Sequence, residues 1–175
     1  MFKYAKIINQ QTGLCEVGTG TNTAFYKSIG MTEQDVLLSD IDGNWYLADK
    51  CPRKSEEQKL AETKSKKQAE NTTKAKQAVE NGHVVFKNAE FETNAQTVGD
   101  LTATMLLMQA GGMETYLWLS KDDQAVELSL EDFGTLGGLI AEFKNTIWQE
   151  KYIAYKTQIE QAETLETVEN IVIEY

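Results

Sequence analysis

Apolar residues recur between Ser129 and Ala162 with the spacing of one helical face. The steps are three, four or five residues with one slip, which fits a period of 3.6. Ser129 is a suitable N-cap, and Asp132 completes a capping box. The pattern predicts one helix of ~50 Å at ~1.5 Å per residue, long enough to support an assembly or to project from one. The apolar positions are Phe133, Leu136, Ile140, Phe143, Ile147, Tyr152, Tyr155 and Ile159.

Gly137 and Gly138 stand inside this predicted helix. Each lowers helix propensity by ~1 kcal/mol relative to alanine. The pair indicates a close helix contact, a kink or a break into two helices, and the sequence leaves these three alternatives open.

Short β-prone runs around turn residues predict three hairpins, over residues 3–18, 83–93 and 115–128. A helix from Asn94 or Thr97 to Gly111 is expected between the last two hairpins. Four shorter elements complete the prediction. They are a helix ending near Ile29, a turn or short helix at Thr32–Val36, a strand at Trp45–Leu47 and a terminal strand at Ile171–Tyr175.

Residues 53–80 have helix-forming composition but almost no apolar stripe, which predicts a polar spacer helix. The fold class is therefore α+β, in three parts. Residues 1–52 form a small N-terminal α+β attachment module and residues 53–81 the spacer. Residues 82–175 form a C-terminal α+β module of two hairpins, a core helix and the long amphipathic helix.

The formal net charge of −10 argues against nucleic acid as a partner, because phosphate binding requires clustered Lys and Arg. The charge is uneven: residues 53–80 carry net +3, whereas residues 81–175 carry net −11. The basic middle is either a solvated helix face or a docking surface for an acidic partner, such as the acidic half of another copy.

No apolar run is long enough for a membrane span, and the first residues lack the features of a signal peptide. Folding in the cytoplasm, or export by a route that needs no such signal, is expected. Cys15 and Cys51 form no metal-ligand spacing and are expected to be free thiols.

Candidate chemistry is sparse. The turn from Asp40 to Asn44 resembles the opening of a calcium loop, but its glycine stands fourth rather than sixth, so a structural turn is the preferred interpretation. His83 is the single histidine, and the adjacent carboxylates Asp122–Asp123 and Glu131–Asp132 suit turn and cap positions. We therefore predict no catalytic residue, cofactor or metal.

Aromatic side chains are the remaining candidates for binding. On short strands they are usually part of the core, although their faces also suit a sugar ring. The predicted interaction surface comprises Trp45, Tyr46, Tyr116, Trp118, Tyr152 and Tyr155.

Two sets of residues follow an order that is found in a known family. Between Gly82 and Ile171 they are Phe86, Phe91, Thr93, Gln96, Trp118, Asp122, Asp123, Val126, Leu128, Ser129, Asp132, Tyr155, Ile159 and Ala162. In this order the region resembles a domain of unknown function at the C-terminal end of many phage and prophage tail proteins. Through the run Asp42 to Leu47, residues 1–52 also look like the N-terminal module of small tail or baseplate-associated proteins from phages of low-GC Gram-positive hosts.

This resemblance implies a location: a structural component of a phage tail or phage-tail-like particle, in the virion or particle and in the host cytoplasm during assembly. It implies other tail or baseplate proteins as partners, and no catalytic residues. The long helix and the polar segment from Arg53 to Glu80 suggest a homo-oligomer, with a trimer as the guess. A tail-fibre assembly chaperone absent from the mature particle is the alternative, and an unrelated cytoplasmic enzyme is a third class.

Overall fold

The computed structural model describes all 175 residues and confirms the α+β class. The chain divides into two compact units, Met1–Lys59 and Leu60–Tyr175, which we describe separately. The helices lack the combination of length and apolar sequence that crossing a bilayer requires.

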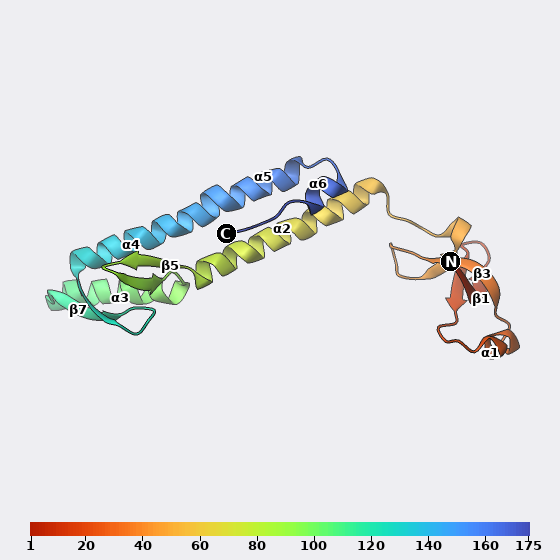
Figure 1. Ribbon diagram of the computed structural model, residues 1–175, viewed down its shortest axis with the longest axis horizontal. Helices are drawn as coiled ribbons and strands as arrows, with labels where there is room; N and C mark the ends of the chain where they lie inside the picture. Colours follow the sequence, from red (N-terminus) through yellow and green to blue (C-terminus); the bar gives the residue numbers. More distant parts are fainter. The chain divides into compact units, whose positions relative to one another are not determined.

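The first unit is a closed barrel in which four antiparallel strands follow the order β1-β2-β4-β3 (Figure 1). Its small core comprises Ala5, Cys15 and Val36. As predicted, β1 and β2 form a hairpin, and β4 covers the expected strand. The strands are β1 (Phe2–Asn9), β2 (Leu14–Val17), β3 (Thr32–Leu38) and β4 (Trp45–Leu47), with α1 (Thr23–Ser28) after β2 and the 3-10 turn η1 (Ala48–Lys50) after β4.

The prediction of a turn or short helix at Thr32–Val36 is wrong, because these residues belong to β3. This strand closes the barrel by pairing Phe2 with Asp35 and Ala5 with Thr32. Only Val36 of this strand is fully buried. The strand begins with four polar residues, so its sequence does not show the alternation of apolar and polar residues that identifies a strand. Pairing with β1, which is distant in sequence, makes it a strand.

The second unit builds its apolar core from two hairpins and a helix that pack against α4. The helix between the hairpins starts at the N-cap Asn94 and ends at Gly112, which has the left-handed conformation (φ 64°). Both hairpins lie where the sequence predicts them. These elements are β5 (His83–Phe86), β6 (Ala89–Glu92), α3 (Ala95–Gly111), β7 (Thr115–Leu119) and β8 (Ala125–Ser129).

The long helix is continuous from Leu130 to Gln161 and begins with the predicted capping box of Ser129 and Asp132. It consists of α4 (Leu130–Asn145), the π-helical segment η2 (Thr146–Tyr152) and α5 (Ile153–Gln161). Gly137 and Gly138 lie inside α4 without a break, and a Cβ at Gly137 would stand 3.6 Å from Leu101. Gly137 therefore lies at ordinary contact distance from α3, whereas a Cβ at Gly138 would meet nothing within 4 Å, and the pair does not break the helix.

The π-helical segment explains the longest step in the apolar stripe. Ile147 and Tyr152 are five residues apart and both lie in η2. A π-helix bonds residue i to residue i+5 and therefore advances more residues per turn than an α-helix. This local change keeps the stripe on one face where a regular helix would rotate it away.

Helix α2 (Glu56–Asn81) lies beside α5 and runs antiparallel to it (Figure 1). Its two buried residues are Asn71 and Ala75. From Leu60 onward it belongs to the second unit, so the polar segment predicted as a spacer packs within the chain.

After α5, the chain forms the short helix α6 (Leu165–Glu169) and returns in an extended conformation between α2 and α5 (Figure 1). The prediction of a terminal strand at Ile171–Tyr175 is wrong, because these residues join no sheet. Side chains of the two flanking helices bind this segment instead of a neighbouring strand.

Candidate functional site

The six aromatic residues predicted as an interaction surface lie on four elements, one in the first unit and three in the second. Trp45 and Tyr46 lie on β4 of the barrel, where Trp45 packs against the core and the Tyr46 hydroxyl donates to Asp42 (2.7 Å). Tyr116 and Trp118 lie on β7 and contact the Phe133 ring edge-on. The remaining pair adjoins a more promising region of the second unit.

Tyr152 and Tyr155 lie on η2 and α5, at a polar seam between α5 and α2. Three α2 side chains donate to backbone carbonyls of the facing helix. The pairs are Lys64 with Glu160 (2.8 Å), Gln68 with Lys156 (3.2 Å) and Asn71 with Tyr152 (3.1 Å). The three donors are spaced four and three residues apart, so they lie on one face of α2. Although α2 has no apolar stripe, this polar face binds the facing helix specifically.

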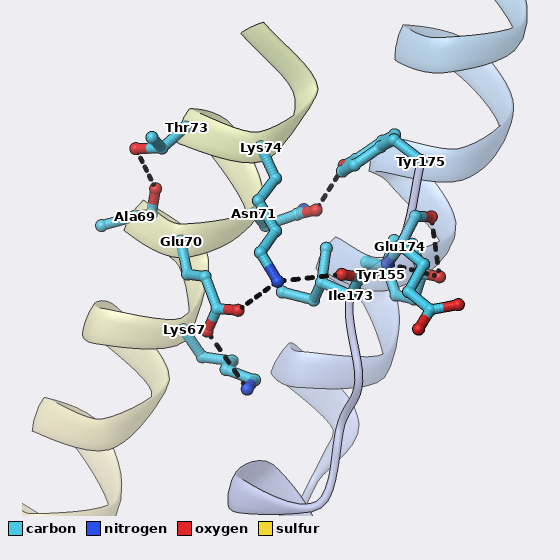
Figure 2. Close-up of polar contacts among 10 residues, drawn as sticks. All are labelled: Lys67, Ala69, Glu70, Asn71, Thr73, Lys74, Tyr155, Ile173, Glu174 and Tyr175. Carbon is cyan, nitrogen blue, oxygen red and sulfur yellow. Dashed lines mark hydrogen bonds and ion pairs between the residues drawn. The ribbon is translucent and has the colours of Figure 1, made fainter. Parts of the chain in front are cut away.

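Asn71 is the centre of this seam. Its side chain is completely buried and donates to the Tyr152 carbonyl. It also accepts a hydrogen bond from the Tyr175 hydroxyl, as Figure 2 shows. A buried amide is costly unless its donors and acceptor have partners, and here both groups are bonded. Asn71 therefore joins α2, η2 and the C-terminal residue.

We define the C-terminal arm as residues 163–175, which comprise α6 and the extended segment after it. The arm buries Val168 and Ile173. The α2 lysine Lys74 donates to the Ile173 carbonyl (3.0 Å), and the Tyr155 hydroxyl bonds both the Glu174 carbonyl (3.1 Å) and the Glu174 N–H (3.2 Å) (Figure 2). The arm is thus bound through its backbone, as an extended peptide would be.

Charge reinforces the binding of the arm. Glu70 bonds Lys74 (2.9 Å) and Lys67 (3.2 Å), and these ammonium groups, Lys74 first, hold the pKa of the Glu70 carboxyl below its usual value (Figure 2). Lys74 is therefore oriented between a carboxylate on its own helix and a carbonyl of the arm. The arm itself carries four glutamates and no basic residue.

A cluster of tyrosines completes the site. The rings of Tyr155 and Tyr175 contact each other edge-on with centroids 5.8 Å apart. Burial, followed by the proximity of Tyr155 and Tyr152, raises the pKa of Tyr175 to about 12. The phenol that bonds Asn71 is therefore kept neutral.

Two surface hollows flank Tyr175 and share Lys151 as a lining residue. The first, of about 480 Å³, lies along α5 and is lined by Tyr155, Gln158 and Glu174. The second, of about 370 Å³, extends along η2 to the end of α2 and is mostly apolar, with Phe143 and Ile147 in its wall. The groove between the helices therefore continues beyond the end of the arm.

Sequence reasoning placed Tyr152 and Tyr155 on the helix but missed Asn71, Lys74 and the arm that they bind. The five-residue step from Ile147 to Tyr152 was the available signal, because π-helical segments are frequent at functional sites. No local sequence pattern shows which backbone carbonyl a buried asparagine binds.

The other candidate chemistry has structural explanations. In the Asp40–Asn44 turn, Asp42 accepts from the Tyr46 hydroxyl and the Asn44 N–H, which hold the pKa of its carboxyl well below the usual value. Asp132 has its pKa lowered to about 2 by Lys87 and by the Ser129 cap. Cys15 and Cys51 are free thiols, and no three metal-ligating side chains gather.

Comparison with known proteins gives one match. A family described as a domain of unknown function, DUF4376, matches residues 56–174, which include α2, both hairpins, the long helix and nearly all of the arm. No curated protein and no solved structure matches the chain.

Proposed function

The chain belongs to the DUF4376 family, and on this premise we propose that it is a structural component of a phage tail or phage-tail-like particle. It acts by binding other tail or baseplate proteins, and it performs no catalysis. The resemblance of residues 82–171 to the C-terminal domain of tail proteins supports this role. The first unit then serves as the attachment module.

The carrying observation is the seam between α2, α5 and the arm, because it is built for polypeptide recognition. Lys74 and Tyr155 donate to backbone carbonyls of the arm. Asn71 donates to the Tyr152 carbonyl and accepts a hydrogen bond from the Tyr175 hydroxyl. A site of this kind recognises an extended chain. Elsewhere, the lowered pKa of Asp42 is explained by hydrogen bonds within its turn, and the lowered pKa of Asp132 by Lys87 and the Ser129 cap.

Exposed apolar side chains supply further surfaces for protein contacts. In the second unit, Leu117 and Leu119 point away from the core on β7, and Leu106 and Leu107 are exposed on α3. In the first unit, Phe2 and Ile41 are exposed. Leu117 and Leu119 are two residues apart on one strand and so lie on the same face of β7, which makes this face the best candidate for a protein contact.

We still propose a homo-oligomer, but the polar face of α2 no longer argues for it. The polar face of α2 that suggested an oligomer has a partner within the same chain. Contacts between copies must therefore use another surface, or exchange an element that now binds within one copy.

Quantitative mass spectrometry of purified tail particles from the source tests the proposed function. A fixed molar ratio of this chain to the other tail proteins is the expected result. Recovery from the lysate with none in the particle would overturn the structural role and favour the assembly chaperone. Particles from a strain lacking the gene provide the matched control.

A further inference from the structure

Strand β7 (Thr115–Leu119) has one edge without a partner strand. Its sheet contains only β7 and β8, so the side of β7 away from β8 pairs with no other strand (Figure 1). Four of its five residues are exposed, and Leu117 and Leu119 retain 65% and 62% exposure. An unpaired edge of this kind is a template for pairing with another strand.

The ladder with β8 decides which backbone groups this edge presents. The Ser120 N–H bonds the Gln124 carbonyl at the hairpin turn, and hydrogen-bonded pairs then alternate along an antiparallel ladder. Every second residue of β7 therefore bonds β8, whereas the N–H and carbonyl groups of Thr115, Leu117 and Leu119 face the other edge. No backbone group elsewhere in the chain bonds these groups.

The same edge lacks the charged side chains that discourage strands of different chains from pairing. In the second unit, β6 carries Glu90 and Glu92, β8 carries Glu127, and β5 lies against α4. Strand β7 has no charged residue, although residues 81–175 carry net −11. Two copies can therefore meet along this edge without bringing carboxylates together.

A second copy of β7 fits this edge in an antiparallel register. With the two-fold axis at Leu117, this residue pairs with itself, and Thr115 pairs with Leu119 of the second copy. Each free N–H then meets a free carbonyl, because all three residues form hydrogen-bonded pairs in this register. Just beyond the strand, Glu114 faces Ser120, so no acidic residue faces another.

Glu127 argues against the other way of covering these leucines, which is to stack two sheets face to face. It lies directly opposite Leu117 on β8 and accepts from the Thr115 hydroxyl (2.8 Å), so its carboxylate is on the leucine face. Stacking would press two unpaired carboxylates against apolar side chains, which is costly. Edge pairing leaves Glu127 in solvent on the far strand and brings Leu117 of both copies into contact.

We infer that two copies of the chain associate by antiparallel pairing of β7 with β7 around Leu117, which joins their hairpins into one sheet. This inference deepens the proposed function and rests on its homo-oligomer, for which it names the contact. The pairing is two-fold and closes on itself, so it predicts a dimer in place of the trimer guessed from the sequence. The edge is short, so we expect a weak dimer that depends on concentration.

The first experiment places one positive charge at either of two positions on the same face of β7. In Leu117→Lys the charge faces its own copy across the new ladder, whereas in Leu119→Lys it faces Thr115. Like charges directly opposite each other destabilise a strand pair. Sedimentation velocity over a concentration series should show association at least about 10-fold weaker than wild type for Leu117→Lys, and less than about 3-fold weaker for Leu119→Lys.

Two results of this experiment would overturn the inference. One is an equal loss of association in both variants, because the two carry the same added charge and differ only in what that charge faces. The other is a wild-type chain that stays monomeric at every concentration.

The second experiment tests the register by disulfide cross-linking in a Cys51→Ser background, in which Cys15 is buried. Hydrogen-bonded residues of an antiparallel pair have Cα atoms about 5.5 Å apart, which a disulfide spans. Leu117→Cys should therefore form a linked dimer by itself under mild oxidation. Thr115→Cys and Leu119→Cys should cross-link when mixed, and neither should do so alone.

Equal cross-linking of every variant alone would indicate random collision and contradict the register. An absence of cross-linking in all of them, with far-UV circular dichroism like that of wild type, would remove the β7 contact. All three substituted positions are exposed, so the hairpin is expected to fold in each variant.

Failure of this inference is distinguishable from failure of the proposed function. A chain found in the particle at fixed ratio that neither associates nor cross-links leaves the tail role standing and removes the β7 contact. A chain that dimerises through β7 but is absent from the particle keeps the contact and removes the tail role. The full chain is the probe in each experiment.

Discussion

The second unit contains two regions that differ in their polar contacts. Around Phe133, the hairpins, α3 and α4 bury a contiguous apolar cluster. Between α2, α5 and the arm, apolar residues such as Val168 and Ile173 are also buried, but here Lys64, Gln68, Asn71 and Lys74 donate hydrogen bonds to backbone carbonyls as well. An apolar core tolerates other apolar side chains of similar volume, whereas a polar seam is stable only when each donor faces its acceptor.

This contrast explains a division of roles. Apolar burial supplies most of the free energy of folding and is insensitive to small shifts. Hydrogen bonds to backbone contribute less net free energy but specify register, because a misplaced donor leaves a buried carbonyl unpaired. A region that must recognise one particular arm is therefore better built from the second kind of contact.

The largest loss of stability is expected from a substitution in the apolar region. Phe133→Ala removes a fully buried ring that contacts Tyr116 and Trp118, and should lower the free energy of unfolding by about 3–5 kcal/mol. Urea unfolding followed by tryptophan fluorescence measures it. Leu117→Ala, on the exposed side of β7, is the control and should change stability by less than about 0.5 kcal/mol. Similar losses in both would refute the assignment of the core.

The next largest loss of stability is expected from a substitution in the polar seam. Asn71→Leu keeps most of the volume but removes the partner of the Tyr175 hydroxyl and the donor to the Tyr152 carbonyl. We expect a loss of about 1–3 kcal/mol. Gln77→Leu makes the same change on the exposed side of α2 and serves as the control. An unchanged unfolding midpoint for Asn71→Leu would show that these two hydrogen bonds do not stabilise the fold.

A smaller effect tests a polar contact at the edge of the apolar region. Ser129→Ala removes the cap of α4, which bonds the Asp132 N–H (3.2 Å), and should cost about 1 kcal/mol. Ser129→Thr retains a hydroxyl and should cost less. Thermal unfolding by circular dichroism compares the two variants with wild type, and an equal loss in both would exclude capping as the cause.

The last effect concerns pH, and it is confined to alkaline solution. The pKa of Tyr175 is raised from 10.0 to about 12, so the neutral phenol is favoured in the folded state. This contribution is complete below pH 10, the usual pKa, and disappears as the pH rises through about 12. Tyr175→Phe should flatten the decline of stability over this interval.

Denaturant unfolding at several alkaline pH values measures that flattening. Wild type is the reference. If Tyr175→Phe follows the same decline as wild type, the phenol of Tyr175 is not protected in the folded protein.

Prediction from sequence succeeded where a short segment contains its own signal. Ser129 with Asp132, and Asn94 with the glycines after α3, mark helix ends by local hydrogen bonds and backbone conformation. The hairpins consist of β-prone runs on either side of turn residues, and these runs pair as predicted. Of the candidate site, only Tyr152 and Tyr155 were anticipated.

The errors have a common physical cause. Thr32–Leu38 is a strand because β1 and β4 bind its edges, although its own residues are mostly polar. Ile171–Tyr175 is β-prone but has no strand beside it, so the side chains of two helices bind it instead. Strand formation depends on a distant partner, which local composition does not reveal.

By itself, the sequence determined the α+β class, the helix ends and the apolar stripe of the long helix, because each depends on neighbours within a few residues. Only the tertiary structure decided the closure of the barrel, the pairing of α2 with α5 and the binding of the arm. Asn71 is 104 residues from the tyrosine that it bonds. Such contacts depend on where the whole fold places each group, and no local pattern encodes that position.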